Sequence, residues 1–214
     1  MEELKTIDGV MSDPFVSENN FNCLMRVAET FAQSSIVPQQ YQNKPADCMI
    51  AVDLANRMHL NPLFVMQQLY VVKGKPSWSG QACMSMIRAS TEFKDVRPVY
   101  TGEKGTNTWG CYIQATRRST GEVVNGPEVT IGIAKAEGWF SKIDRFGNET
   151  SKWKTMPELM LAYRASAFFA RVHIPNTLMG FAVEGEAEDI ARPDPEDAYA
   201  PDVFVEAECH DPNA

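Results

Sequence analysis

The last part of this 214-residue chain limits how much of it can fold. Residues 183–214 combine eleven acidic residues with four prolines. Such a segment cannot bury enough apolar surface to offset the entropy lost on ordering, so we expect a disordered acidic C-terminal tail. The folded domain is therefore expected at residues 1–182, where a chain that is 44% hydrophobic can build one good core.

Charge is distributed unevenly along the sequence. The whole chain has 20 basic and 28 acidic residues, a net charge of −8, which taken alone disfavours binding to a polyanion. Residues 73–175 nevertheless hold 15 basic and 9 acidic residues, whereas residues 176–214 hold 1 basic and 11 acidic residues. Salt screens charges over roughly 8–10 Å, so a ligand responds to the local field. The middle of the chain can therefore attract a polyanion that the whole would repel.

Cysteine usage and the absence of apolar runs indicate the compartment. The five cysteines are far apart and never form a CxxC pair, and with three histidines they give no zinc-ligand spacing. Reduced thiols buried as small hydrophobic side chains in a cytoplasm fit this pattern best. The N-terminus has no signal-peptide pattern and no 18-residue apolar stretch occurs, so we expect a cytoplasmic protein without membrane contact.

Apolar periodicity in the first third predicts helices. Residues at helical spacing predict one helix over about 20–32 and a second that begins at Pro45, with Ile50 among its inward side chains. Asn61-Pro62 resembles the cap and first turn of a third, shorter helix. These apolar stripes are core positions, and we assign them no chemistry.

The periodicity changes from helix to strand after Gln68. Lys73-Gly-Lys75 separates two strand-like runs and predicts a hairpin, because Gly74 can supply the positive φ of a tight turn. Its tip presents two lysines, with Trp78 near its base. A short helix over 80–90 should follow, and then three strands, at 96–100, 109–115 and 129–133. In the second strand, Trp109, Cys111, Ile113 and Ala115 alternate onto one face.

The expected fold is therefore α+β. A small antiparallel sheet with a β-hairpin packs against several helices, and the acidic tail follows. The expected parts of the folded domain are an N-terminal arm, a helical part, a part with the hairpin and sheet, and a part with a basic, aromatic loop and helix, at residues 1–19, 20–69, 70–133 and 134–182.

Cations and aromatic rings alternate between Ala134 and Arg171. Seven Lys and Arg residues are interleaved there with seven aromatic residues. Cations neutralise phosphates and flat rings stack on unpaired bases, a mixture that suits a single nucleic-acid strand better than a closed duplex. A basic surface over an aromatic core is the alternative, and the four tryptophans are open to either role. Candidate contacts that rest on charge are Arg117, Lys135, Lys142, Arg145 and Lys154.

The clearest predicted helix start is Thr155-Met-Pro-Glu158. Thr at the cap with Glu three residues later makes a capping box, and the helix should run to about His173. Arg164, Phe168 and Arg171 share one face, where two arginines can meet successive phosphates. The alternative for this face is a solvated edge.

An ordered set of motifs resembles a known family. Residues 136–180 read AEGW…K…GN…SKW…MPELML-YRA…FFAR…P…MG, and they resemble the RecT branch of the RecT/Redβ single-strand annealing proteins of phages and prophages. Upstream segments fit too, so the resemblance spans roughly residues 20–190. They are Ala28-Glu-Thr-Phe-Ala32, Val37-Pro38, Asn61-Pro62, Tyr70-Val-Val72, Gly74-Lys75-Pro76 and Gly121-Glu122.

The resemblance implies a protein that coats single-stranded DNA and anneals it to a complementary strand without ATP, through a duplex intermediate. It also implies a homo-oligomer, either a ring or a helical filament, with DNA in a basic groove that runs between subunits. The expected setting is phage recombination in the bacterial host cytoplasm, beside a 5′→3′ exonuclease and a host single-strand-binding protein. The residues that occupy family motifs lining the groove are Lys73, Lys75, Lys152, Arg164 and Arg171, and Trp78 and Phe168 are candidate ring contacts beside them. The short acidic end departs from the family's longer C-terminal region, so partner contacts of that region do not carry over.

Two other function classes remain open from the residues. Carboxylates at Glu137, Asp144, Glu149 and Glu158 could hold Mg²⁺ in a nuclease, although no metal-ligand spacing occurs, Glu158 is expected to act as a cap, and no other cofactor is expected. No GxxxxGK[ST] motif for ATP is present. The acidic total instead favours a protein-binding adaptor or DNA mimic, which the crowding of acids into the tail opposes.

Overall fold

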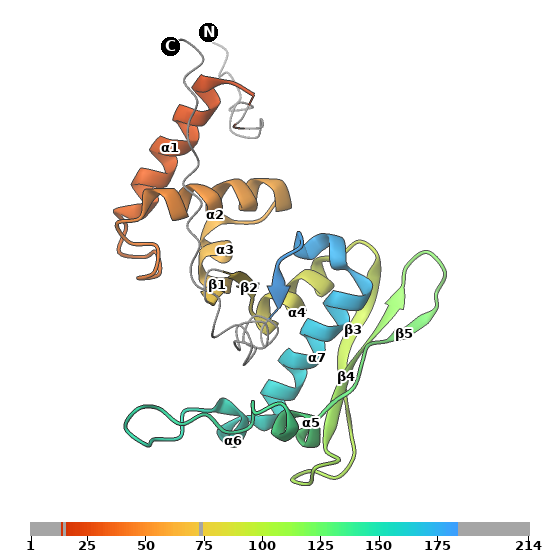
Figure 1. The fold of residues 1–214 in the computed structure, drawn as a ribbon. Helices are drawn as coiled ribbons and strands as arrows, with labels where there is room; N and C mark the ends of the chain where they lie inside the picture. The colour runs from red at the N-terminus through yellow and green to blue at the C-terminus, as the bar shows by residue number, and fades with distance from the viewer. Residues whose placement is uncertain (1–13, 15, 73–74, 184–214) are drawn as a thin grey trace, which may run out of the picture.

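The computed structural model describes residues 14, 16–72 and 75–183, and Figure 1 shows their arrangement. The fold is α+β, as the sequence predicts, with helices at the N-terminal end, a small sheet in the middle and a larger sheet covered by helices. The tail expected at 183–214, apart from Val183, lies outside the described residues, as do most of the expected N-terminal arm and residues 73–74 of the hairpin. None of the described helices is long and apolar enough to cross a membrane.

Three helices form the N-terminal part, as expected, and side chains cap two of them. They are α1 (Glu18–Ala32), α2 (Pro45–Met58) and α3 (Pro62–Gln68). Ser17 Oγ accepts a hydrogen bond from the Asn20 N–H at the start of α1. Asn61 Oδ1 accepts one from the Leu63 N–H, 2.8 Å away, at the start of α3.

Small buried side chains let α1 and α2 pack together. Ala28 on α1 and Cys48 and Ala51 on α2 are fully or almost fully buried. The prediction that Ile50 faces inward is wrong, because this residue is 58% exposed. The burial of Cys48, shared by Cys83 and Cys111 elsewhere in the core, confirms the expected role of these thiols as small hydrophobic groups.

A small central sheet pairs residues 69–78 with the C-terminal end of the described chain. Its strands, in the order β1-β2-β7, are β1 (Leu69–Val72), β2 (Lys75–Trp78) and β7 (Ala182–Val183). β1 and β2 form the predicted antiparallel hairpin, and β7 pairs with β2 in parallel. Val183 is fully buried in this sheet, so the folded part extends one residue beyond the boundary expected from the sequence.

The larger sheet has the order β3-β4-β5, with β6 also paired to β4. Its strands are β3 (Phe93–Thr101), β4 (Gly110–Arg117), β5 (Val123–Asn125) and β6 (Val129–Thr130). Cys111, Ile113 and Ala115 alternate onto the buried face of β4, as the sequence predicts. The predicted end of the strand at 129–133 is wrong. The strand ends at Thr130, whose side chain accepts a hydrogen bond from the Ile133 N–H and so caps helix α5 (Ile131–Ala136).

Two helices pack on this sheet and on each other. They are α4 (Gly80–Ala89) and α7 (Pro157–His173), and both contact the sheet. A Cβ atom at position 80 would lie 2.7 Å from the Tyr163 carbonyl oxygen, so only glycine permits this close approach of α4 to α7. The helices therefore form one compact layer behind the strands (Figure 1).

The start of α7 differs from the predicted capping box. Thr155 is the last residue of a short helix, α6 (Lys152–Thr155), and Met156 precedes α7 without any side-chain cap. The Glu158 carboxylate instead contacts Lys104 Nζ at 3.0 Å. The end of α7 at His173 confirms the prediction, and a 3₁₀ turn, η2 (Pro175–Leu178), follows.

Candidate nucleic-acid interface

A narrow arm projects from the body between α5 and α6 (Figure 1). We use "the arm" for residues 141–150 and "the foot of the arm" for the end of it that adjoins α6. The Thr150 N–H donates to the Lys142 carbonyl oxygen at 2.7 Å, and the Asp144 N–H donates to the Asn148 carbonyl oxygen at 3.0 Å. These bonds run between two antiparallel legs, which also form a bridge between Ile143 and Glu149. The sequence predicted only a basic, aromatic loop here.

The tip of the arm is a turn organised by one carboxylate. Asp144 Oδ1 accepts hydrogen bonds from the N–H groups of Phe146 at 2.8 Å and Asn148 at 2.9 Å. Gly147 has a φ of +83°, which favours glycine. Hydrogen bonding, first of all from the Asn148 backbone, holds the pKa of Asp144 below its ordinary value. The turn is therefore stabilised while this carboxylate is ionised.

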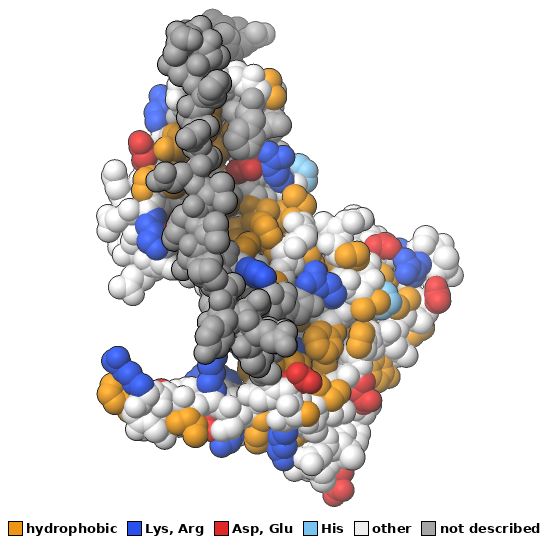
Figure 2. All heavy atoms as spheres, in the orientation of Figure 1, with side chains coloured by type: hydrophobic (Ala, Val, Ile, Leu, Met, Phe, Trp, Pro, Cys, Tyr) orange, Lys and Arg blue, Asp and Glu red, His pale blue; other side chains and the backbone are white. Residues whose placement is uncertain are grey.

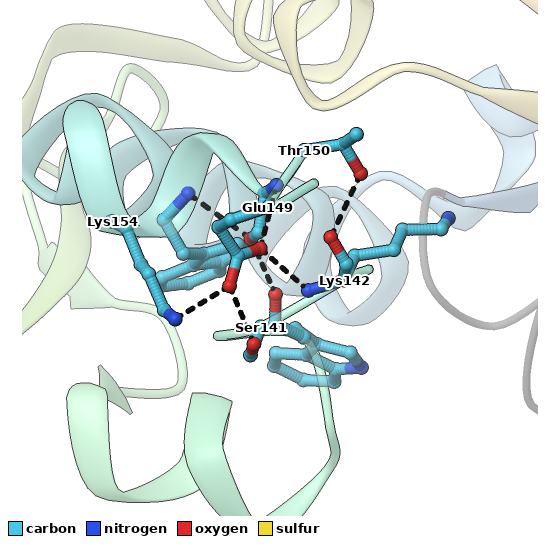
Figure 3. A network of polar contacts seen from close by, with 8 residues as sticks. Ser141, Lys142, Glu149, Thr150 and Lys154 are labelled. Atoms are coloured by element: carbon cyan, nitrogen blue, oxygen red, sulfur yellow. Dashed lines mark hydrogen bonds and ion pairs between the residues drawn. The ribbon is translucent and has the colours of Figure 1, made fainter. Parts of the chain in front are cut away.

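A second carboxylate closes the foot of the arm (Figure 3). Glu149 Oε1 accepts hydrogen bonds from the N–H groups of Lys142 at 2.8 Å and Ser151 at 3.0 Å. Glu149 Oε2 accepts from Ser141 Oγ at 2.6 Å and contacts Lys154 Nζ at 2.5 Å. These partners, Lys154 first, hold the pKa of Glu149 far below its ordinary range. One ionised side chain thus joins both legs to α6.

The arm stands on a cluster of rings between α6 and the middle of α7. The Trp139 ring lies 6.1 Å from the Trp153 ring and meets the Phe168 ring edge-on at 6.4 Å. The Arg164 guanidinium lies 3.8 Å from the Trp139 ring centroid. Trp153 is 6% exposed, so this cluster continues the core up to the foot of the arm.

The predicted cations around the arm have different settings. Lys142 and Arg145 on the arm and Lys152 at its foot are exposed. Lys154 is also exposed but contacts Glu149. Lys135 on α5 is exposed as well, and its Nζ donates to the Asn107 side chain at 2.8 Å and lies 5.1 Å from the Phe140 ring.

The prediction that Arg164 and Phe168 lie on an exposed face of α7 is wrong. Arg164 is 7% exposed, because Trp139 covers its guanidinium, and Phe168 is half-buried against the same ring. The buried guanidinium is therefore not an exposed phosphate contact in this structure. The sequence did not reveal this burial, because it depends on Trp139, a loop side chain. Such a side chain can pack over a helix face that helical spacing alone predicts to be exposed to solvent.

Trp78 is a further correction. Its side chain is fully buried, and its Nε1 donates a hydrogen bond to the Leu178 carbonyl oxygen at 3.2 Å. The ring also lies 6.3 Å from that of Phe181. Trp78 therefore belongs to the core that joins β2 to the end of the chain, and it is not a surface for base stacking.

Arg117 lies away from the arm. Arg117 is the last residue of β4 and pairs with Phe93, at the opposite end of β3 from Thr101. A nine-residue strand spans roughly 27 Å. The guanidinium contacts the carboxylates of Glu92 at 2.6 Å and Glu122 at 3.9 Å, so it is paired locally.

The remaining predicted contacts lie near the central sheet. Lys75 is exposed at the start of β2, and Lys73 falls outside the described residues. Arg171 is half-buried near the end of α7, and its Nη1 donates to the Phe181 carbonyl oxygen at 3.4 Å. Phe181 directly precedes β7, which pairs with β2. α7 therefore connects the foot of the arm with the region that holds Arg171 and Lys75.

The arm and the N-terminal helical part both carry cations. Figure 2 shows the arm and the helical part projecting from the same side of the molecule, with Lys and Arg side chains on both. Near the central sheet, an open pocket in this part of the fold is lined by residues of α2, β1 and β2 and by Phe181. Cations therefore occur on both projecting parts of the described structure.

The carboxylates considered for a metal site are dispersed. Asp144 organises the tip, Glu149 binds Lys154, and Glu158 binds Lys104. Within the described ranges, no group of three His, Cys, Asp or Glu side chains is arranged to hold a metal ion.

Comparison with protein-family models, with curated protein sequences and with solved structures finds no match to this chain.

Proposed function

We propose that this protein binds single-stranded DNA and anneals complementary strands without ATP, as its resemblance to the RecT branch implies. The observation that carries the proposal is the arm and its foot, which expose Lys142, Arg145 and Lys152 beside a cluster of aromatic rings. Residues 136–180, which bear the family resemblance, form one continuous unit of arm, α6 and α7. Buried rings thus support a projection that carries exposed cations.

Annealing without ATP has two physical requirements. Phosphates must be neutralised so that two strands can approach, and the bases must stay open on their pairing edges. Exposed cations meet the first requirement by releasing counterions from the strand. Base pairing then supplies both sequence recognition and the driving force, so the protein needs no base-specific contacts.

The corrections at Arg164 and Trp78 change which residues would hold DNA. Exposed cations of the arm and its foot, with Lys75 and Arg171 near the central sheet, are the contacts we propose. Arg164 instead supports the arm from beneath Trp139. By the same resemblance, we propose a homo-oligomer, a ring or a helical filament, that acts with a phage 5′→3′ exonuclease and a host single-strand-binding protein in the bacterial cytoplasm.

An annealing assay tests the proposal. Two complementary oligonucleotides with a donor and an acceptor dye are mixed with the purified protein, without nucleotide, over a salt series. The expected result is faster energy transfer than without protein for complementary strands, none for unrelated strands, and affinity for one strand that falls steeply with salt. Binding that is unchanged between low and moderate salt, or pairing that is no faster with protein, would contradict the proposal. Labelled strands that shorten in the presence of Mg²⁺ would favour a nuclease.

A further inference from the structure

An aromatic ring projects from the tip of the arm. The Phe146 side chain is 73% exposed, and Ile143 on the adjoining leg is 66% exposed. A large apolar side chain raised away from the body on a narrow projection gains nothing from the core of its own subunit. Isolated exposed rings are common on protein surfaces, so the surroundings of this ring decide whether it can hold a ligand.

The ring stands on a structured turn. The Phe146 N–H donates to Asp144 Oδ1, and that oxygen also accepts the Asn148 N–H. The Gly147 N–H donates to the Asp144 carbonyl oxygen at 3.0 Å. These bonds fix the backbone on both sides of Phe146, so less conformational entropy is lost when the ring binds a ligand.

The surroundings of the ring are cationic. The Arg145 guanidinium lies 4.7 Å from the Phe146 ring centroid, and Lys142 is exposed on the first leg. The carboxylate of Asp144 is turned to backbone N–H groups, and that of Glu149 contacts Lys154. Positive charge is thus available next to a flat apolar face.

This chemistry fits a nucleotide better than a protein surface. The cores of protein–protein interfaces are depleted in lysine and need a contiguous apolar patch. The tip offers one exposed ring and one aliphatic side chain among cations and the polar Asn148. An unpaired nucleotide has both a face that stacks on a ring and a phosphate that pairs with a cation.

We propose that Phe146 and Arg145 form a nucleobase-stacking site at the tip of the arm, which holds one unpaired base of a single strand while Arg145 and Lys142 contact the adjoining phosphates. This inference rests on the proposed binding of single-stranded DNA and assigns a ligand to the tip. The stacked base is kept from stacking on its neighbours, and its pairing edge stays open to a second strand.

Variants of Phe146 distinguish a ring contact from a merely apolar one. Phe146→Ala removes the side chain, Phe146→Leu keeps apolar volume without a ring, and Phe146→Trp keeps a ring. The control is Val123→Ala, because Val123 is 58% exposed on β5 and lies on the strand that pairs with the far part of β4. Thermal unfolding of each variant verifies that the fold is intact.

Binding is measured by fluorescence anisotropy with a labelled oligothymidine and with an abasic oligonucleotide of the same length. Phe146→Ala should raise Kd for oligothymidine by about fivefold to a hundredfold and leave Kd for the abasic strand unchanged. Phe146→Leu should behave like Phe146→Ala, and Phe146→Trp like the unmodified protein. The slope of log Kd against log salt should not change, because the ring neutralises no phosphate.

Three results would overturn the stacking site while leaving the proposed function in place. They are salt-dependent strand binding with no effect of Phe146→Ala, full recovery by Phe146→Leu, and equal weakening on the abasic strand. Recovery by Phe146→Leu together with a changed sedimentation coefficient of Phe146→Ala would assign the tip to contact with a second copy of the chain. If the unmodified protein binds neither strand, both proposals fail.

Discussion

The Arg164 guanidinium lies 3.8 Å from the centroid of the Trp139 ring, at the foot of the arm. The side chain is 7% exposed, so the contact is largely shielded from solvent. A desolvated cation over an indole face stabilises more than an exposed one. Arg164 therefore belongs to the support of the arm, and the loop that carries Trp139 is fastened to α7 through it.

Arg164→Ala should therefore act on stability. We expect the free energy of unfolding to fall by about 2 kcal/mol, because the cation–π contact and the packing of the arginine stem are both lost. Arg164→Lys should recover only part of the loss, since lysine lacks the flat guanidinium. Urea denaturation measures this. A variant of unchanged stability whose DNA binding has a smaller salt slope would instead mean that Arg164 contacts a phosphate.

Lys152→Ala should weaken DNA binding without affecting the fold. Lys152 is exposed at the start of α6, so we expect lower affinity for every sequence and a salt slope smaller by about 0.7 to 1. Lys94→Ala is the matched control, because Lys94 is also exposed. It pairs with Thr116, at the end of the larger sheet that holds Arg117 and lies away from the arm. Anisotropy titrations at several salt concentrations provide the measurement. Equal effects of the two substitutions would mean that binding depends on total charge alone.

The closure of the arm should resist mild acid. Glu149 has a pKa far below the ordinary 4.5, chiefly because Lys154 contacts its charged form. A lowered folded-state pKa means that the stabilisation is fully present above about pH 4.5 and is lost as the pH falls through the folded value. NMR shifts of the Lys142 and Ser151 N–H groups should follow this titration. A midpoint near 4.5 would show that the carboxylate is not held in this way.

The Glu149→Gln variant complements the pH titration. The amide oxygen can replace Oε1 as the acceptor for the Lys142 and Ser151 N–H groups, but an NH₂ group in place of Oε2 cannot accept from Ser141 or bind the Lys154 ammonium. Amide exchange in the arm should therefore be faster than in the unmodified protein at neutral pH, and the protection of these amides relative to their intrinsic exchange rates should not change over the range where Glu149 titrates. Exchange identical to that of the unmodified protein would assign arm closure to the leg-to-leg bonds.

Removal of residues 184–214 should strengthen DNA binding. That segment holds eleven acidic residues and one basic residue, so the remaining chain has a net charge of +2 in place of −8. A polyanion is repelled less by the shortened protein. Titration with labelled single strands compares the two proteins, and the free 184–214 peptide should compete with DNA for the shortened one. Loss of DNA binding on removal would favour the adaptor or DNA-mimic function.

Local signals predicted most of the elements, because they act over a few residues. The Asn61 cap and the alternation along β4 depend on adjacent groups, and both occur as expected. The end of α7 at His173 follows from the nearby proline. The prediction of a capping box at Thr155 is wrong, because Ser151 caps a helix that begins earlier. Its side chain accepts a hydrogen bond from the Trp153 N–H at the start of α6.

Burial of the predicted site residues depends on contacts that sequence spacing does not reveal. Arg164 and Arg171 have the expected spacing on α7, but Trp139 covers only the first of them. Trp78 is buried because the chain returns a hundred residues later to accept its N–H bond at Leu178. Periodicity can identify a helix face, but not the distant segment that packs on it.

The pairing of β2 with β7 has a consequence for synthesis. Ser77 is paired with Ala182, so the central sheet lacks an edge strand until residue 183 has left the ribosome. Domains otherwise begin to fold as they emerge. The N-terminal helices and the hairpin must therefore wait, incompletely covered, for nearly the whole chain to be translated, and a ribosome that stalls before this strand leaves Trp78 open to chaperones and proteases.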